Sequence, residues 1–357
     1  MTVSVSKIDS LLDPAPAQRS AQALPTPAEL RRQLPLDAEL QRTIATQRQA
    51  IRAILDGRDD RLLVVVGPCS AHDPRAVMEY AERLAALSRH VGDRLLLVMR
   101  VYVEKPRTTV GWKGLAYDPH LDGSDDMAHG LTLSRRLMRD IAMLGLPVAT
   151  ELLQPMAAAY FDDLLAWAAI GARTTESQIH RELASGLEAI VGFKNATHGG
   201  VGVAIDAMRA AAQGHRHFGM DQHGRPVMHE TPGNAYTHLV LRGGHGGPNY
   251  DAESVADSRR QLEAAGLRPN LMVDCSHANS RKDHRRQGEV LLDVLTRRLA
   301  GESGLVGVML ESHLNEGKQP LDLQALRYGV SVTDACLGWE TTEHLLEHVA
   351  ARLRNEP

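Results

Sequence analysis

The fold of this chain is decided by the stretch RLLVVVGPCSAHDPRAVMEYAERLAALSRHVGDRLLLVMRVYV (61–103). It begins with the continuous apolar run LLVVVG (62–67), passes into a helical pattern over 74–90, and ends on a second apolar run, LLLVMRVYV (95–103). Uninterrupted apolar strands are typical of parallel sheets, which are buried on both faces. The stretch therefore predicts a strand, a helix and a second strand parallel to the first.

The same alternation continues to the end of the chain. Six further strand-like runs follow: PVATEL (147–152), AWAAIGAR (166–173), AIVGFKN (189–195), THLVLRG (237–243), NLMVDCSH (270–277) and LVGVMLES (305–312). Helical patterns lie between and after them, among others over 129–144, 253–266 and 333–353. Eight such runs in alternation with helices predict a closed α/β barrel of the (β/α)8, or TIM, type. The alternative is a doubly wound open sheet.

Two segments depart from this repeat and define the domain organisation. Residues 1–60 are predicted to form an N-terminal arm and helix, and residues 61–357 to form the barrel. Near 213–233 the segment HFGMDQHGRPVMHE alternates around a His-Gly turn, which predicts an inserted β-hairpin.

Composition limits the classes of protein that the chain can represent. It has 357 residues, a formal net charge of −4 and 43% hydrophobic residues. A net negative charge argues against a nucleic-acid binder, and no apolar run is long enough to span a membrane. The three cysteines, Cys69, Cys275 and Cys336, are too few for a disulfide scaffold. Together with the lack of a signal-peptide pattern, they predict a cytoplasmic protein.

Charged side chains stand at or just after the ends of the predicted strands. In a barrel, the carboxyl ends of the strands and the loops after them build the active site. Taken singly, each charge could be an ion-paired structural group. A set of cations on one rim would repel one another without an anionic ligand, so we predict small substrates with more than one anionic group. The phosphate-binding sequence motifs of nucleotide sites are absent. The predicted cationic set is Arg100, Lys105, Arg173, Lys194 and Arg242.

A second group of strand-end residues suits a metal ion. Cys69 follows the first predicted strand, His277 the seventh and Glu311 the eighth, while Asp334 stands at the start of the last predicted helix. The first and eighth strands are neighbours when a barrel closes. One thiolate, one imidazole and two carboxylates favour a divalent transition metal (Mn2+, Co2+, Fe2+ or Zn2+) over Mg2+ or Ca2+. Singly, the cysteine could be a buried apolar residue and Asp334 could be a helix cap.

Several long motifs resemble the class I, metal-dependent 3-deoxy-D-arabino-heptulosonate 7-phosphate (DAHP) synthase family, whose members begin aromatic amino-acid biosynthesis. They are GPCSAHD (67–73), MRVYVEKPRTTVGWKG (99–114), GARTTESQIHRELASGL (171–187), GFKNATHGG (192–200), DCSHANSRK (274–282), ESHLNEG (311–317) and TDACLGWE (333–340). The resemblance extends from about residue 25 to the end of the chain. It implies the barrel fold and a soluble enzyme of the shikimate pathway that forms homo-oligomers, dimers or tetramers.

The resemblance also assigns roles to individual residues. The metal ligands would be Cys69, His277, Glu311 and Asp334. Phosphoenolpyruvate would be held by Arg100, Lys105, Arg173, Lys194 and Arg242, with Glu151 nearby. Erythrose 4-phosphate would be received by Lys105, Pro106, Arg107 and Thr108. The groups expected to take part in the chemistry itself are Lys105, Lys194, His277 and Asp334. His180 lies in a family motif, and its role could be structural.

The implied reaction joins the enol carbon of phosphoenolpyruvate to the aldehyde of erythrose 4-phosphate, with addition of water and loss of phosphate. A divalent metal would stabilise the negative charge on the aldehyde oxygen, and two lysines would stabilise charge or move protons. One alternative is the related 3-deoxy-octulosonate 8-phosphate synthase reaction with arabinose 5-phosphate. The KPRTT segment (105–109) favours the four-carbon sugar. The other alternative is a homologue that binds phosphoenolpyruvate or metal without turnover.

Overall fold

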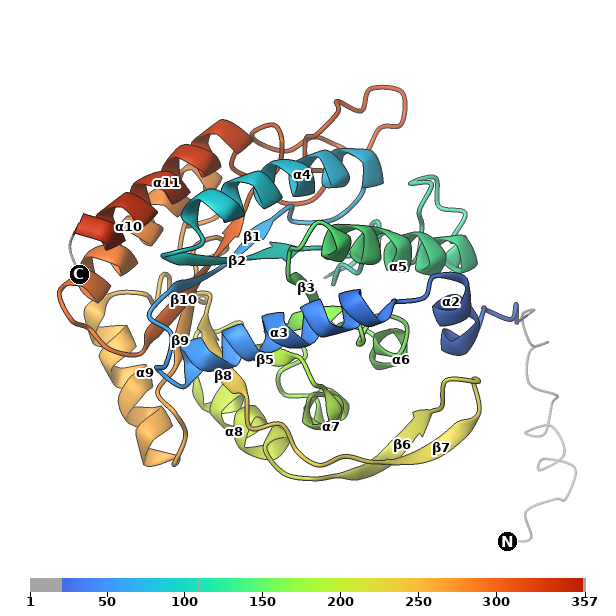
Figure 1. The fold of residues 1–357 in the computed structure, drawn as a ribbon, viewed down its shortest axis with the longest axis horizontal. Coiled ribbons are helices and arrows are strands. Elements are labelled where there is room, and N and C mark those ends of the chain that lie inside the picture. Colours follow the sequence, from blue (N-terminus) through green and yellow to red (C-terminus); the bar gives the residue numbers. More distant parts are fainter. Residues whose placement is uncertain (1–20, 108, 356–357) are drawn as a thin grey trace, which may run out of the picture.

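A computed structural model describes residues 21–107 and 109–355 of the chain. Eight parallel strands form a closed barrel, and helices surround it (Figure 1). Each barrel strand pairs with the next one along the chain, and β10 pairs with β1 to close the ring. The strands are β1 (Leu62–Gly67), β2 (Leu95–Arg100), β3 (Val148–Glu151), β4 (Leu165–Ile170), β5 (Ile190–Lys194), β8 (Thr237–Leu241), β9 (Leu271–Asp274) and β10 (Leu305–Glu311). The predicted (β/α)8 barrel is therefore confirmed.

Alternation along each strand explains why a continuous apolar run is needed. In β1, Leu63 and Val65 belong to an inner cluster together with Trp167 and Met309. The residues of β1 between and beside them belong to the outer cluster, which the surrounding helices cover. Because successive side chains of a strand point to opposite faces, both faces of a barrel strand have to be apolar.

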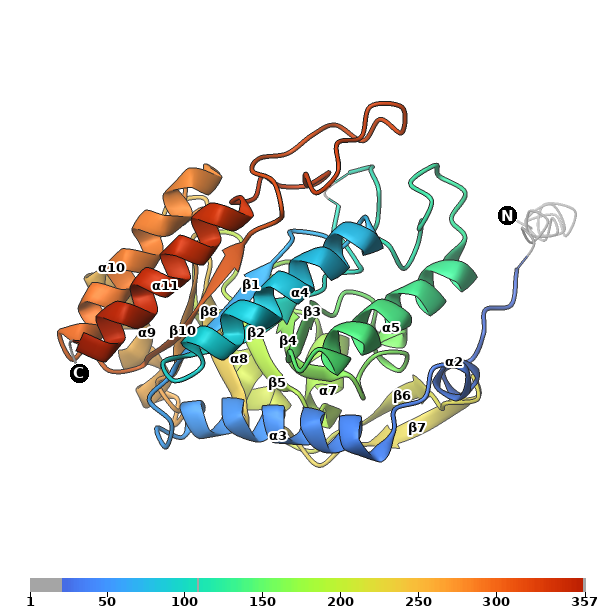
Figure 2. The ribbon, with the colours of Figure 1, turned by 45° about the horizontal axis from the view of Figure 1, so that its top comes forward.

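The helices around the barrel follow the strands in sequence (Figure 2). The helix α4 begins at Pro74 with Asp73 as its N-cap, and Pro at the first position is compatible with a helix start because it lacks an N–H. The helices after β1 are α4 (Pro74–Val91), α5 (Met127–Met143), α6 (Pro155–Ala158), α7 (Gln178–Gly186), α8 (Gly202–Ala211), α9 (Ala252–Ala264), the 3-10 helix η1 (His284–Arg286), α10 (Gln287–Leu299) and α11 (Trp339–Asn355).

Within residues 21–61, two helices precede the barrel. The helix α2 (Pro27–Gln33) starts at a capping box in which Thr26 and Glu29 satisfy each other's backbone N–H groups. The helix α3 (Ala38–Leu55) places Ile51 and Ile54 against the inner cluster. The end of α3 therefore covers one end of the barrel interior.

The inserted hairpin predicted near 213–233 is present as an antiparallel pair, β6 (Arg216–Met220) and β7 (Pro226–Glu230). It extends away from the barrel beyond α7 toward α2 (Figure 1). Its turn meets the N-terminal arm, since the Ala28 N–H donates to the Gln222 carbonyl at 2.9 Å.

The last helix differs from the prediction. A helix was expected over 333–353, with Asp334 at its start, but α11 begins at Trp339. The Gly317 and Cys336 backbones exchange hydrogen bonds of 2.9 and 3.1 Å, and the Leu337 N–H donates to the Glu311 carbonyl. These long-range pairings keep 333–338 out of the helix, because backbone groups bonded across the loop are no longer available to it.

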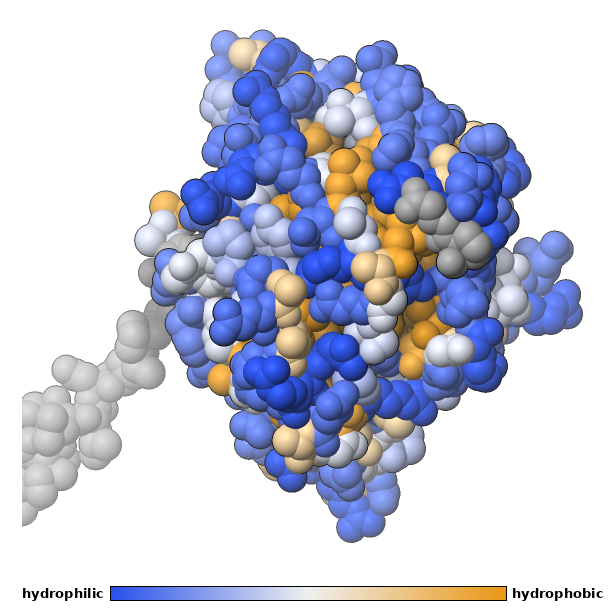
Figure 3. All heavy atoms as spheres, turned by 90° about the vertical axis from the view of Figure 1, so that its left-hand side faces the viewer, coloured by the Kyte–Doolittle hydropathy of each residue, from blue (hydrophilic) through white to orange (hydrophobic). Residues whose placement is uncertain are grey.

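No helix among the described residues is long and apolar enough to cross a membrane. On the face seen in Figure 3, hydrophilic side chains cover most of the surface, and apolar groups show mainly in the recesses between them.

Candidate active site

A cavity of about 470 Å3 lies at the carboxyl ends of the barrel strands. Seven cationic side chains and three carboxylates line it, so its wall is net positive. A cationic hollow in a net negative protein concentrates the field on small anions. The charged lining residues are Lys105, Arg107, Glu151, Arg173, Lys194, Arg242, Lys282, Glu311, Lys318 and Asp334.

Three predicted metal ligands meet in one place. One ligand atom each from Cys69, Glu311 and Asp334 lies within 4.8 Å of the other two. Burial, together with the charge of Glu311, raises the pKa of the Cys69 thiol to about 11. Two carboxylates beside a thiol repel as anions, and a divalent transition metal would relieve that repulsion while accepting sulfur and oxygen together. The donor set therefore fits such a metal.

The fold explains how residues far apart in sequence form this cluster. Pairing of β1 with β10 sets Gly67 beside Glu311, and Cys69 follows two residues later. Gly67 has a φ of 149°, and a Cβ there would lie 2.9 Å from the Arg100 carbonyl oxygen, so a side chain would collide with β2. The non-helical segment before α11 brings Asp334 over the cluster, and the Asp334 carboxylate lies 3.7 Å from the Cys69 sulfur.

The fourth predicted ligand, His277, lines the same cavity but lies outside the group defined by the 4.8 Å limit. Its backbone has a φ of 55°, an uncommon left-handed conformation for a residue with a side chain. The Nδ1 atom lies 2.9 Å from the Asp274 carboxylate and 2.7 Å from the Ser276 hydroxyl. A carboxylate on Nδ1 leaves Nε2 as the nitrogen available to a metal, which is the usual arrangement of histidine ligands.

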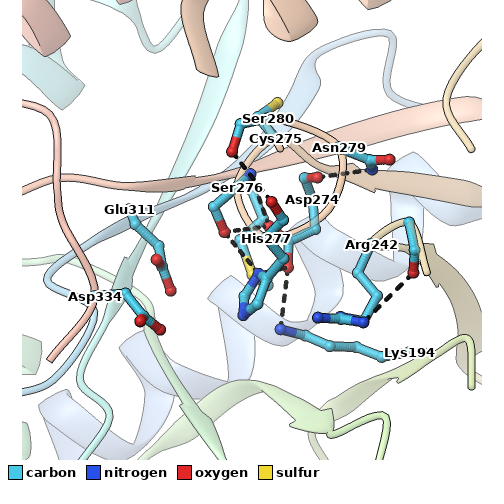
Figure 4. A network of polar contacts seen from close by, with 12 residues as sticks. Lys194, Arg242, Asp274, Cys275, Ser276, His277, Asn279, Ser280, Glu311 and Asp334 are labelled. Atoms are coloured by element: carbon cyan, nitrogen blue, oxygen red, sulfur yellow. Dashed lines mark hydrogen bonds and ion pairs between the residues drawn. The ribbon is translucent and has the colours of Figure 1, made fainter. Parts of the chain in front are cut away.

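Asp274 is a residue of the site that the sequence analysis did not identify. Its carboxylate is fully buried and contacts both Lys194 Nζ, at 3.1 Å, and His277 Nδ1 (Figure 4). Its other oxygen accepts from the Ser276 hydroxyl at 2.7 Å. Burial by itself raises the pKa of Asp274, but His277 and Lys194 outweigh it and hold the pKa well below its usual value. The position of Asp274 at the end of β9 and its place at the start of the motif DCSHANSRK (274–282) were the signals that could have identified it.

Arg100 was expected to hold phosphoenolpyruvate, and it lies beneath the cavity rather than in its wall. Its side chain is 1% exposed, and Nη2 donates to Glu311 at 3.0 Å. The guanidinium also lies 4.0 Å from the centre of the Tyr102 ring. In this position Arg100 supports the Glu311 carboxylate from below.

Lys105 stands between the acidic cluster and the cationic wall. Its Nζ lies 3.0 Å from the Cys69 carbonyl oxygen and 3.3 Å from the Cys69 sulfur. Burial lowers the pKa of Lys105, but the neighbouring Cys69, Glu311 and Glu151 outweigh this and raise it. The ammonium is therefore held in its charged form next to the candidate metal ligands.

The other predicted substrate residues that the structure describes all line the cavity. They are Pro106, Arg107, Glu151, Arg173, Lys194 and Arg242. Thr108 lies outside the described residues. The cavity also has cationic or titratable groups that the sequence analysis missed, because they follow the strands at a distance: Lys282, His284 and Lys318.

Comparisons with known proteins identify the family and agree with the fold. The model of the DAHP synthetase I family matches residues 38–347. The Tyr-sensitive phospho-2-dehydro-3-deoxyheptonate aldolase of Escherichia coli K12 is 51% identical over 94% of this chain and 94% of its own length. The Phe-sensitive enzyme of the same organism is 51% identical over 91% of this chain and 93% of its own length.

A solved structure extends the likeness to three dimensions. The phospho-2-dehydro-3-deoxyheptonate aldolase of Francisella tularensis superposes with a TM-score of 0.93 at 44% identity. The superposition covers 95% of this chain and 99% of the other. The fold and site define a barrel enzyme for small anionic substrates, and the chain belongs to the DAHP synthetase I family of metal-dependent DAHP synthases.

Proposed function

We propose that the chain condenses phosphoenolpyruvate with D-erythrose 4-phosphate and water to give DAHP and inorganic phosphate. The observation that carries this proposal is the cavity itself, where a Cys-Glu-Asp cluster adjoins a wall of cationic side chains. Such a site draws two anionic substrates together and orients them, which removes much of the entropic barrier of a two-substrate reaction. Family membership supports the same activity.

Phosphoenolpyruvate is assigned to the part of the wall with Arg173, Lys194 and Arg242. An arginine fork matches phosphate or carboxylate with two parallel hydrogen bonds, and a lysine adds a point charge. Lys194 is 3% exposed and is aimed by Asp274, so its position is set before substrate arrives. Glu151 lies at the end of β3 in the same wall, and Arg100 adds positive charge from beneath Glu311.

Erythrose 4-phosphate is assigned to the mouth of the cavity, where Pro106 and Arg107 stand next to Lys105. Thr108 of the same segment belongs to the proposal from the sequence alone. This arrangement sets the aldehyde end of the sugar toward the acidic cluster and its phosphate toward the exposed Arg107.

The metal is assigned to Cys69, His277, Glu311 and Asp334, as Mn2+, Co2+, Fe2+ or Zn2+. When bound, a cation of this kind supplies Lewis-acid stabilisation for the oxygen on which negative charge develops. The proton transfers rest on Lys105 Nζ, Lys194 Nζ, the His277 ring and the Asp334 carboxylate. Burial raises the pKa of Asp334, but Lys105 and His277 outweigh burial and lower the pKa, so this carboxylate is ionised at neutral pH.

The function is tested by following phosphoenolpyruvate consumption and phosphate release with erythrose 4-phosphate, and in parallel with arabinose 5-phosphate. Equal consumption and release with the four-carbon sugar supports the proposal. Turnover with the five-carbon sugar alone would reassign the chain to the octulosonate reaction. Binding of phosphoenolpyruvate without turnover of either sugar would contradict both.

Metal removal is expected to abolish this activity. Chelation should remove the cation that joins the thiol and the carboxylates, and adding Mn2+ or Co2+ to the chelated protein should restore turnover. The measurement is the initial rate before chelation, after it and after metal addition, with circular dichroism as the control for folding. Full turnover by a protein shown to be metal-free would disprove the metal assignment.

Replacement of Arg173 or Arg242 by Ala is expected to impair the use of phosphoenolpyruvate. Loss of one charged partner from a desolvated anion costs about 2–5 kcal/mol in binding. The measurement is the KM for each substrate and kcat in both variants. Arg260→Ala, on the exposed pair with Asp257 in α9, is the control. Unchanged phosphoenolpyruvate parameters in both cavity variants would show that the wall is misassigned.

We further propose that the chain forms a homo-oligomer, a dimer or tetramer, through the hairpin. Phe218 on β6 is 100% exposed, and Met228, its cross-strand partner on β7, is 65% exposed. Such apolar groups on a projecting hairpin favour burial against another chain. Light scattering is expected to give a multiple of the mass of one chain, and Phe218→Ser should shift it downward. A monomer at all concentrations would contradict this assignment.

A further inference from the structure

Glu104 is a buried carboxylate next to Lys105 that the proposed mechanism does not use. It follows β2 by four residues, and its side chain is 2% exposed. A buried carboxylate is costly unless it accepts hydrogen bonds, so its partners indicate what it holds together.

The partners of Glu104 come from two other parts of the chain. Its Oε2 accepts from the Leu153 N–H at 3.3 Å, and its Oε1 accepts from the Gln154 N–H at 3.2 Å. The Tyr117 hydroxyl donates to Oε1 at 3.4 Å. Leu153 and Gln154 connect β3, which ends at Glu151, to α6. One side chain therefore joins the segment after β2 to the segment after β3.

The contact lies at the base of the loop that carries Lys105 and Arg107. The two ends of this loop are tied together, since the Lys105 N–H donates to the Lys113 carbonyl at 2.8 Å. Gly114 has a φ of 115°, and a Cβ there would lie 2.2 Å from the Val103 carbonyl oxygen. The base is thus closely packed, while the side chain of Arg107 is exposed at the cavity mouth.

On its far side, the 153–154 segment is held by His180. The His180 Nε2 lies 2.8 Å from the Leu153 carbonyl oxygen, and Nδ1 lies 2.9 Å from the Ser177 hydroxyl. Because a carbonyl only accepts, Nε2 carries the proton and donates to it. Ser177 ends the turn that begins after β4 and contains Arg173.

Contacts therefore run from the Lys105 loop through Glu104, the 153–154 segment and His180 to the turn with Arg173. The Lys105 loop and the turn with Arg173 differ in the further hydrogen bonds that hold each of them in place. In the turn, the Thr175 hydroxyl donates to the carbonyls of Gly171 and Lys194, each at 2.9 Å. The two ends of the Lys105 loop are joined by the hydrogen bond between Lys105 and Lys113. Glu104 attaches this base of the loop to the 153–154 segment.

We propose that Glu104 is a positioning residue, which clamps the Lys105 loop to the 153–154 segment and thereby sets Arg107 for the phosphate of the sugar substrate. This inference rests on the proposed function. It makes Glu104, acting through Arg107, a determinant of the affinity for the aldose phosphate. The turn with Arg173 keeps its own hydrogen bonds, and Lys105 Nζ keeps its contacts with the Cys69 carbonyl and sulfur. Loss of the clamp therefore displaces Arg107 and the sugar side of the cavity more than the phosphoenolpyruvate side.

Glu104→Gln tests the clamp while keeping the size of the side chain. A glutamine amide nitrogen cannot accept, so one of the two backbone N–H groups loses its partner. The KM for erythrose 4-phosphate is expected to rise about tenfold to a hundredfold, the range for loss of a charged hydrogen bond, with a smaller change for phosphoenolpyruvate. Tyr117→Phe removes only the hydroxyl donor and should raise the same KM by about threefold.

A pH profile separates the clamp from a simple loss of stability. Burial raises the pKa of Glu104 to about 7, although the Leu153 and Gln154 N–H groups and the Tyr117 hydroxyl partly offset it. The titratable groups around it are Tyr117, Glu151, Lys105 and, across the Leu153 carbonyl, His180. Below about pH 7 the carboxyl becomes neutral and a weaker acceptor, so the KM for the sugar should rise in the wild type. The phosphate of the sugar titrates near this range in every variant, so the informative quantity is the difference from Glu104→Gln, whose profile should lack this component.

The control variant is Asp163→Asn, which removes a carboxylate from the Arg135 ion pair away from the cavity. It should lower the melting temperature without changing either KM. A Glu104→Gln protein with reduced stability or kcat but an unchanged KM and pH profile would overturn the clamp. Absence of wild-type turnover with erythrose 4-phosphate would instead overturn the proposed function.

Discussion

Replacing Asp274 with Asn is expected to weaken metal binding by about 10- to 100-fold and to lower turnover at least as much. The buried carboxylate holds two groups of the site at once, since Oδ2 lies 2.9 Å from His277 Nδ1 and 3.1 Å from Lys194 Nζ. An amide of the same size is neutral and places either an NH2 or a single oxygen at that point. The oxygen without a negative charge would hold the Nδ1 proton and the ammonium more weakly, and the NH2 could not accept from either group.

The measurement for Asp274→Asn is Mn2+ affinity by calorimetry, together with kcat at saturating metal. A loss of Mn2+ affinity would show that His277 is no longer held in place. A loss of kcat that persists at saturating metal would show that Lys194 is displaced. Asp257→Asn, an exposed carboxylate of α9 paired with Arg260, is the matched control and should change neither quantity. Wild-type affinity and kcat in Asp274→Asn would remove Asp274 from the site.

Replacement of Glu311 by Gln is expected to lower the free energy of unfolding of the metal-free protein by about 3–5 kcal/mol, because it leaves a buried cation unpaired. Arg100 is 1% exposed, and its guanidinium forms an ion pair with the Glu311 carboxylate at 3.0 Å. Cys69→Ala removes another proposed ligand from the same cluster but strands no charge, so it should cost only about 1 kcal/mol. Both variants should lose most activity, and the large loss of stability should be confined to Glu311→Gln.

Urea unfolding of the chelated proteins measures this difference directly. A third variant, with Arg100→Met added to Glu311→Gln, removes the stranded cation and should recover part of the lost stability. If Glu311→Gln unfolds within about 1 kcal/mol of the wild type, the buried ion pair does not stabilise the fold as proposed. Equal losses in the Cys69 and Glu311 variants would point to general damage to the cluster.

Much of the candidate site could be predicted because the carboxyl ends of all the barrel strands lie at one face of the barrel. Lys194, Arg242 and Glu311 stand at or beside the ends of strands, so their convergence follows from the topology alone. Asp274 stands at a strand end as well, yet its role was missed. A single carboxylate in a sequence does not reveal whether it faces substrate, metal or another side chain.

Arg100 shows a second limit of prediction from sequence. Alternation along β2 places it on the same face as Val98 and Tyr102, both of which belong to the inner cluster. An inward direction was therefore predictable from its position in the strand. The burial of the Arg100 side chain beneath the cavity was not predictable. It depends on the Glu311 carboxylate and the Met309 sulfur of β10, which contact the guanidinium only once the barrel closes.

The sequence by itself determined the barrel and its eight strands, and it supplied candidates for the ligating and cationic groups, since apolar periodicity and strand-end chemistry are local properties. Only the tertiary structure decided the rest. Asp334 reaches Cys69 because backbone pairing with the segment after β10 keeps 333–338 out of the last helix. Glu104 and Asp274 became visible as connecting carboxylates only through partners distant in the chain. The physical reason is that hydrogen bonds and ion pairs between loops depend on how the strands close into a ring, and no local pattern records that geometry.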